Sequence, residues 1–262
     1  MDLGLKDKVA LVTAGSRGLG RAIAEELAAE GAAVVISSRS REVLETTAAQ
    51  IAAQTGGEVS AIAADLMDAA DVDALVEKVE RTLGPIDILI ANSGGPVARP
   101  FVDLTDDDWH TALNQKLLAQ IRPCRAVLPG MMARGAGRIL TMGGVHGYYP
   151  AAYAITAGVV NAAVLNLTKA LAKTGASRNV LVNSINPGPI RTARITYLCE
   201  VRARDEGISV EEAERVFVDD MMLKRLGDPR DVGALAAFMV SERAGFMTGS
   251  MVSVDGGMHP TI

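Results

Sequence analysis

Thr13-Ala14-Gly15-Ser16-Arg17-Gly18-Leu19-Gly20 joins a short apolar run to a helical pattern. The run before it, residues 8–13, indicates a buried strand, and residues 19–30 carry apolar side chains at helical spacing as far as Gly31. Glycines keep such a turn tight and let backbone N–H groups approach a diphosphate at the helix N-terminus. The stretch therefore predicts a strand, loop and helix that bind a dinucleotide, although a glycine-rich turn without a ligand would share the pattern.

The same alternation continues along the chain. Apolar runs indicate strands at residues 34–37, 59–63, 86–90, 137–142, 180–185 and 252–254, and helical patterns lie at 42–54, 71–83, 105–132 and 151–174. Strands that alternate with helices favour right-handed crossovers and a parallel sheet covered on both faces. We therefore expect a single α/β domain over residues 1–262, with a doubly wound parallel sheet of the Rossmann type.

Composition and charge narrow the classes of function. The chain has 262 residues, 49% of them hydrophobic, and a net charge of −5, without a basic patch mixed with aromatic residues. Nucleic acid is therefore not an expected partner. Residues 1–8 lack the apolar region of a signal peptide, and no apolar run reaches the roughly 18 residues of a membrane span. Cys124 and Cys199 show no metal-ligand spacing, so we expect reduced thiols, no metal, no membrane and a cytoplasmic location.

Later motifs accompany the glycine loop in sequence order. They are Ala91-Asn92-Ser93-Gly94, Pro187-Gly188-Pro189-Ile190-Arg191-Thr192, Arg225-Leu226-Gly227-Asp228-Pro229, and Thr248-Gly249 with Val254-Asp255-Gly256-Gly257. Together they resemble the short-chain dehydrogenase/reductase family over about residues 7–257, with Ala14 in place of the loop's first glycine. The resemblance implies hydride transfer between a nicotinamide cofactor and a small carbonyl or alcohol. Residues to which it assigns the cofactor are Gly15, Ser16, Arg17, Gly18, Leu19, Gly20, Asn92, Gly94, Pro187, Gly188, Ile190 and Thr192.

Charge at the end of the second strand indicates which cofactor is bound. In NAD sites an acidic residue about 20 residues past the loop accepts a hydrogen bond from the ribose 2′-OH. Here Ser38 and Arg39 follow the strand, and Arg17 adds a second cation, so a 2′-phosphate would be attracted. We expect NADP(H) to be favoured over NAD(H), unless Arg39 is only a solvated charge. Asp65-Leu66 resembles the family's adenine contact, although Asp65 could equally cap a turn.

The catalytic end departs from the family. The resemblance implies a Ser, a Tyr proton donor, a Lys four residues later, and an Asn on the preceding long helix. Aligned without gaps, the chain has Gly144, Ala157 and Asn161 at the first three positions, and Asn114 at the fourth. A rival alignment with Tyr153 as the Tyr needs a deletion before it and an insertion inside the helix. Neither supplies a Lys, and Asn161 could bind a ribose hydroxyl but could not acidify a tyrosine.

Candidate replacement proton donors lie close to Ala157 in the sequence. Tyr153 lies one helical turn before Ala157, and His146, Tyr148 and Tyr149 follow the fifth strand, where ligands bind in such folds. We expect Tyr153 first and His146 second as proton donor, with Asn114 holding a water. The competing interpretation of each is a packed or surface loop side chain.

Function and assembly follow as hypotheses. We expect an NADP(H)-dependent oxidoreductase with a non-standard active site; the alternatives are a cofactor-binding pseudoenzyme with a regulatory or scaffold role, or a redox-neutral isomerase or lyase. Residues 193–223 are expected to form a helical substrate lid, or else a core-packing helical pair. Apolar side chains on more than one face of residues 157–173, together with the family resemblance, favour a homo-oligomer, a tetramer.

Overall fold

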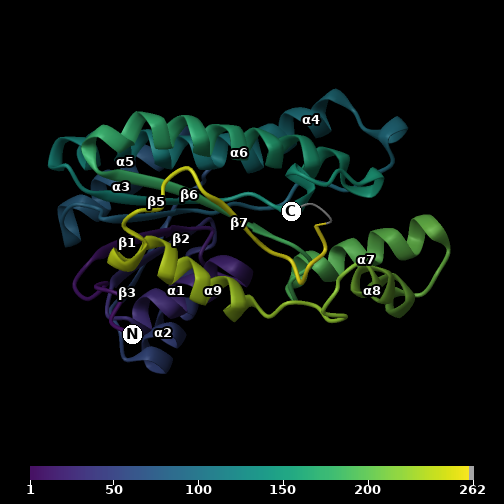
Figure 1. Cartoon of the computed structure of the whole chain (residues 1–262), viewed down its shortest axis with the longest axis horizontal. Coiled ribbons are helices and arrows are strands. Elements are labelled where there is room, and N and C mark those ends of the chain that lie inside the picture. The colour runs from purple at the N-terminus through teal and green to yellow at the C-terminus, as the bar shows by residue number, and fades with distance from the viewer. Residues whose placement is uncertain (260–262) are drawn as a thin grey trace.

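The computed structural model describes residues 1–259, whose strands form one seven-stranded parallel sheet (Figure 1). The strands are β1 (Val9–Thr13), β2 (Ala33–Ser38), β3 (Val59–Ala63), β4 (Ile88–Ala91), β5 (Gly137–Met142), β6 (Val180–Pro187) and β7 (Met251–Val254). Their order across the sheet is β3-β2-β1-β4-β5-β6-β7, so the chain changes direction between β1 and β4. The predicted Rossmann-type fold is confirmed, and the loops after these two strands meet where such folds bind ligands.

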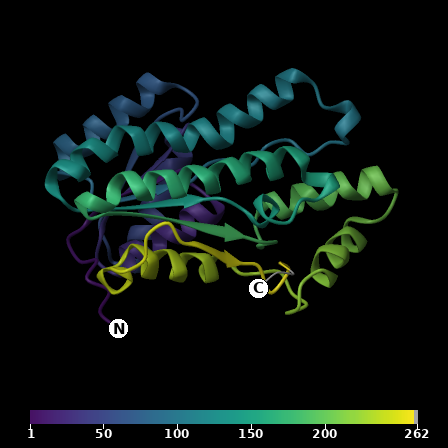
Figure 2. The same ribbon diagram turned by 45° about the horizontal axis from the view of Figure 1, so that its top comes forward.

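Helices cover both faces of the sheet (Figures 1 and 2). One face packs against α1 (Gly18–Ala29), α2 (Arg41–Thr55) and α9 (Pro229–Val240), and the other against α3 (Ala69–Leu83), α5 (Ala119–Arg134) and α6 (Ile155–Gly175). Alternate residues of β1 divide between the two layers, because Ala10 and Val12 join the first apolar core and Val9 and Leu11 join the second. This burial on both faces explains why the strands read as continuous apolar runs.

The long helix expected over residues 105–132 is divided in the structure. It comprises α4 (Asp106–Ala112), a π-helical turn (Leu113–Leu118) and α5. A Thr105–Asp108 capping box begins α4, as the sequence pattern allows. The π turn winds the chain more widely than an α-helix, which changes the direction of every side chain on it. This turn has a direct consequence for the active site.

The segment expected as a lid contains two helices. They are α7 (Ala193–Glu206) and α8 (Val210–Asp219), at the end of the molecule beyond the carboxyl ends of the strands (Figure 1). Both helices pack on a small apolar cluster that includes Ile195, Phe217 and Met221. Arg194, Leu198 and Phe217 also line the cleft described below. The pair is therefore packed on a core of its own and also forms one wall of the cleft.

Helices α9 and α6 pack on opposite faces of the sheet. Helix α9, which is absent from the predicted elements, begins at Pro229 after the N-cap Asp228. Ala152–Arg178 is long and apolar enough to cross a membrane by composition, but 50% of its most apolar window is buried within the protein. Its helix, α6, covers the sheet, and its outer face carries exposed Val159. The buried half of the window belongs to the interior of the protein, as in the core helix of a globular domain.

Candidate active site

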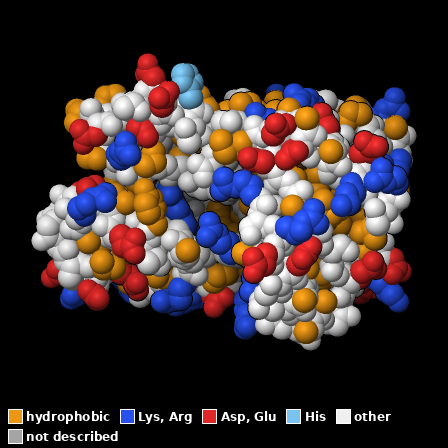
Figure 3. Space-filling view, turned by 180° about the vertical axis from the view of Figure 1, so that it is seen from behind, with side chains coloured by type: hydrophobic (Ala, Val, Ile, Leu, Met, Phe, Trp, Pro, Cys, Tyr) orange, Lys and Arg blue, Asp and Glu red, His pale blue; other side chains and the backbone are white. Residues whose placement is uncertain are grey.

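A cleft of about 1560 Å³ runs along the carboxyl ends of the strands. Its walls are the loops that follow β1 to β6, together with the start of α7. Figure 3 shows the face behind that of Figure 1, where Lys and Arg side chains gather around a hollow in the surface. The cleft has two ends, which different residues line.

The glycine loop forms the first end and is shaped for a diphosphate. Helix α1 starts at Gly18, with a φ of 57°, and its N-cap, Arg17, makes no side-chain hydrogen bond to the first turn. The N–H groups of that turn thus lack a capping side chain, as in a helix terminus that receives an anion. A Cβ on Gly20 would lie 2.7 Å from Asn92 Nδ2, so the close approach of these loops requires glycine. The cofactor diphosphate fits this cradle.

Most residues assigned to the cofactor line the cleft, and two do not. Those that line it are Ser16, Arg17, Gly18, Leu19, Ser38, Arg39, Asp65, Leu66, Asn92, Gly94, Asn161, Pro187, Gly188, Ile190 and Thr192. Gly15 packs against Ile36 instead, and Gly20 packs behind the loop. Asp65 lines the cleft and also accepts a hydrogen bond from Met67 N through Oδ1 (2.9 Å), so the expected turn-capping role is present as well.

The loop after β5 lies at the second end, where the family's catalytic groups are expected. Gly144, Ala157 and Asn161 of the gapless alignment all line the cleft, and so does Tyr153 of the rival alignment. A Cβ on Gly144 would lie only 2.5 Å from Asn161 Nδ2. The Asn161 amide therefore occupies the space that a serine side chain at position 144 would need.

Lys116 is the charged group that the sequence analysis missed. It lies on the π turn, is 8% exposed, and lines the cleft. Its Nζ donates to the carbonyl oxygen of Gly143 (3.3 Å), and none of the ion pairs among residues 1–259 involves it. Burial, with a smaller contribution from the positive charge of Arg194, lowers the pKa of Lys116 to about 8. Residues 113–118 read Leu-Asn-Gln-Lys-Leu-Leu, and this mixed pattern does not mark Lys116 as buried.

Asn114, expected to hold a catalytic water, does not line the cleft. Its Oδ1 is buried without a hydrogen-bond partner. Asn114 and Lys116 both lie on the π turn, and only Lys116 lines the cleft. The expected role of Asn114 in holding a catalytic water stays a prediction.

Tyr153 and His146 both line the cleft and interact with each other. Tyr153 Oη lies 3.4 Å from His146 Nε2, and the rings pack edge to face. His146 Nδ1 lies 3.1 Å from the Tyr149 carbonyl oxygen, which can only accept, so Nδ1 carries the proton and Nε2 accepts from Tyr153. Burial raises the pKa of Tyr153 to about 12 and lowers that of His146. Both groups are therefore held in their neutral forms near pH 7.

Comparison with known proteins identifies the class. Residues 13–259 match the family described as enoyl-(acyl carrier protein) reductase. The chain is 34% identical over 257 residues to 3-oxoacyl-[acyl-carrier-protein] reductase FabG of Vibrio harveyi (98% of this chain and 99% of the relative). It is 35% identical to dehydrogenase/reductase SDR family member 4 of Sus scrofa (97% and 88%). The chain therefore belongs to the short-chain dehydrogenase/reductase family and is an enzyme of the dehydrogenase/reductase type.

A solved structure agrees over the whole chain. The L-sorbose reductase of Gluconobacter frateurii, complexed with NADPH and L-sorbose, superposes with a TM-score of 0.93, 33% identity and 100% coverage of both chains. The actinorhodin polyketide ketoreductase, in a variant form with NADPH, superposes with the same TM-score at 28% identity, covering 97% of this chain and 98% of that one. Both of these structures contain NADPH.

Proposed function

We propose that the protein is an NADP(H)-dependent oxidoreductase that interconverts a carbonyl and an alcohol, with Lys116 as the proton donor. The single observation that carries the proposal is a buried lysine in the same cleft as the diphosphate cradle. Arg17 and Arg39 line the other end of the cleft, where no acidic residue follows β2 and a 2′-phosphate would be attracted. The NADPH held by the relatives named above supports the same choice of cofactor.

Lys116 suits proton transfer better than the tyrosine and histidine expected from the sequence. A general acid works best when its pKa lies near the working pH, and the pKa of Lys116, about 8, meets this condition. Tyr153 is a weaker acid, with a pKa of about 12, and its proton is directed to His146. We therefore replace Tyr153 and His146 by Lys116 as the expected donor.

Carbonyl reduction needs a hydride donor and a proton donor. Bound NADPH supplies a hydride to the carbonyl carbon. The carbonyl oxygen becomes an alkoxide and takes a proton from the Lys116 ammonium, which leaves a neutral amine that can still donate to Gly143 O. The Asn161 amide, buried beside Gly144, would donate a hydrogen bond to a ribose hydroxyl of the cofactor. Oxidation of the alcohol runs through the same groups in reverse.

The test is NADPH oxidation with a panel of aldehydes and ketones, run with parent protein and with Lys116→Met, Tyr153→Phe and His146→Ala. We expect Lys116→Met alone to slow turnover by roughly 10²–10⁴-fold, the usual contribution of a positioned acid. The rate of reduction by the parent protein should fall above a pH of about 8, as Lys116 loses its proton. If the parent protein keeps its rate of reduction up to pH 10 and Tyr153→Phe lowers that rate, Tyr153 and not Lys116 is the proton donor.

A cofactor-binding pseudoenzyme is the second candidate. The observation that favours it is the absence of a Tyr–Lys pair four residues apart, with Ala157 and Asn161 in those positions. NADPH binding, followed by the change in cofactor fluorescence, separates the two candidates. Tight NADPH binding without oxidation by any carbonyl of the panel would support the pseudoenzyme.

A further inference from the structure

The substrate end of the cleft contains a second cation, Arg194. It is half-buried in the second position of α7, and its guanidinium carbon lies 5.3 Å from the centre of the Tyr197 ring. A Cβ on Gly95 would lie 2.8 Å from Arg194 Nε, so the guanidinium rests against the loop after β4. Arg194 is therefore confined between Tyr197 and that loop.

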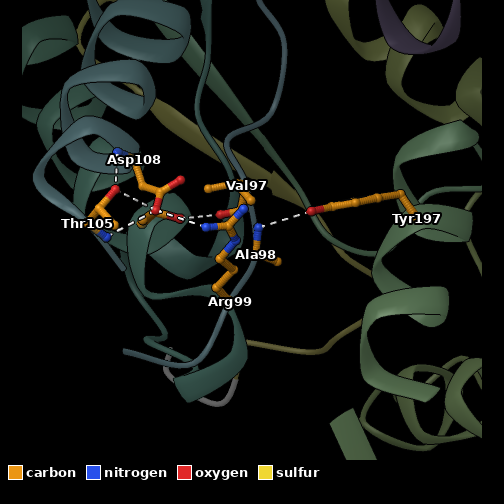
Figure 4. A network of polar contacts seen from close by, with 7 residues as sticks. Val97, Ala98, Arg99, Thr105, Asp108 and Tyr197 are labelled. Carbon is orange, nitrogen blue, oxygen red and sulfur yellow. Dashed lines mark hydrogen bonds and ion pairs between the residues drawn. The ribbon is translucent and has the colours of Figure 1, made fainter. Parts of the chain in front are cut away.

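Tyr197 is itself fixed across the cleft. Figure 4 shows its side chain reaching from α7 to the segment that follows β4, where Tyr197 Oη accepts a hydrogen bond from Ala98 N (3.3 Å). That segment is held in turn by Thr156, whose Oγ1 donates to Val97 O (2.7 Å). The aromatic platform under Arg194 is thus anchored to two parts of the fold. The platform restricts the guanidinium, so a ligand that binds there loses little freedom of the arginine.

The charge of Arg194 has no anionic partner in the described chain. None of the ion pairs among residues 1–259 includes Arg194, and burial lowers its pKa. The Lys116 carbonyl oxygen accepts a hydrogen bond from Ser93 Oγ (3.3 Å), and Arg194 rests against Gly95 two residues further on, so both cations lie beside the loop after β4. The positive charge of Arg194 accordingly lowers the pKa of both Lys116 and His146. Two cations that approach each other in a half-buried cleft without a carboxylate are destabilising unless an anion binds between them.

We propose that the substrate is an oxo acid, a carbonyl compound whose carboxylate binds Arg194 while its carbonyl oxygen lies at Lys116. The substrate class rests on the proposed reductase function. A guanidinium offers two parallel N–H donors that match a carboxylate, and such charge-assisted pairs are the strong ones. The carboxylate would replace the missing counter-charge and would favour the protonated form of Lys116 that reduction requires.

The competing role for Arg194 is to hold a phosphate of the cofactor. The diphosphate cradle, however, lies at Gly18 and the start of α1, whereas the Arg194 guanidinium rests against Gly95 in the loop after β4. Binding of cofactor and binding of acid must therefore be measured separately.

The experiment uses the full-length protein with bound NADP⁺ and measures binding by calorimetry. The probes are acetoacetate and levulinate, with acetoacetamide and levulinamide as uncharged partners of the same shape. The variants are Arg194→Met, Arg194→Lys and, as the matched control on the same helix, Arg204→Met, whose guanidinium is exposed and pairs with Asp205. Affinity of each protein for NADPH is measured in parallel.

We expect the acids to bind at least tenfold more tightly than the amides to the parent protein and to Arg204→Met. In Arg194→Met this preference should be lost, because the affinity for the acids should fall by about 10- to 100-fold, the contribution of a charge-assisted pair. Arg194→Lys should keep part of the preference. NADPH affinity should change by less than about twofold in all variants. Retained preference in Arg194→Met, equal binding of acids and amides, no binding of either acid, or an equal loss of NADPH affinity would each overturn the proposal.

The binding assay separates this inference from the proposed function. Acids that bind through Arg194 to a protein that oxidises no NADPH would refute the reductase and leave the anion site intact. Amides that are reduced at the same rate as the acids would support the reductase and refute the anion site at Arg194.

Discussion

Lys116→Met should make the fold more stable while it removes the proposed proton donor. The side chain is 8% exposed, and its pKa falls from 10.5 to about 8 because the charged form is buried. At about 1.4 kcal/mol per pKa unit, a shift of about 2.5 units corresponds to roughly 3 kcal/mol of destabilisation when the native protein must carry the charge. Methionine keeps the length of the apolar stem and removes the ammonium, so most of this free energy should be recovered.

The gain should depend on pH in a defined direction. Between the folded pKa near 8 and the unfolded value of 10.5, the unfolded chain binds more protons than the native protein, so the stability of the parent rises with pH. Below pH 8 both states are protonated and the full difference of roughly 3 kcal/mol remains. Near pH 9.5 the advantage of Lys116→Met should shrink to about 1 kcal/mol, because the native lysine is by then mostly neutral.

Urea unfolding of the cofactor-free proteins at pH 7 and pH 9.5, at equal protein concentration, measures both values. The matched control is Lys169→Met. Lys169 also donates to a backbone carbonyl, Gly249 O, at 3.1 Å, but it lies on the exposed surface. Equal stability of Lys116→Met and parent at pH 7, or a difference that does not shrink at pH 9.5, would show that the lysine is not held as a buried charge.

Three further outcomes are expected. Arg39→Ala should reduce the preference for NADP(H) over NAD(H) by about 1–3 kcal/mol in parallel binding titrations, and equal affinities in the parent protein would contradict it. Gly144→Ser should destabilise the protein, by about 1–3 kcal/mol in urea, because the new Cβ would lie 2.5 Å from Asn161 Nδ2; Gly144→Ser with Asn161→Ala should recover part of the loss. Leu167→Glu, in the apolar groove between α5 and α6, should lower the assembly size seen by light scattering, and a parent protein that is monomeric at micromolar concentration would contradict the predicted tetramer.

The fold could be predicted because its signals are local. The loop at Gly18 and the alternation of apolar runs with helical patterns each depend on a few neighbouring residues, and these predictions were confirmed. The start of α9 carries a local signal too, since Asp228 and Pro229 are a common N-cap and first residue of a helix. This signal overlaps the family motif at residues 225–229, and no helix was predicted from it.

The site was harder to predict because its geometry depends on contacts distant in sequence. Lys116 was missed because no residue pattern announces the π turn on which it lies. Arg194 was missed because its position against Gly95 arises from the docking of α7, nearly a hundred residues further along the chain than the loop it touches. The low acidity of Tyr153 likewise follows from its burial beside Phe217, which the sequence alone does not show.

The contact between Gly144 and Asn161 also constrains the order in which the sequence can change. Because the Asn161 amide lies beside Gly144, a serine at 144 requires the Asn161 side chain to turn away or residue 161 to be smaller. The two positions are epistatic, and the path that starts at residue 144 passes through a less stable intermediate. A shorter side chain at residue 161 would remove this cost, so a change there makes a later serine at 144 easier to accept.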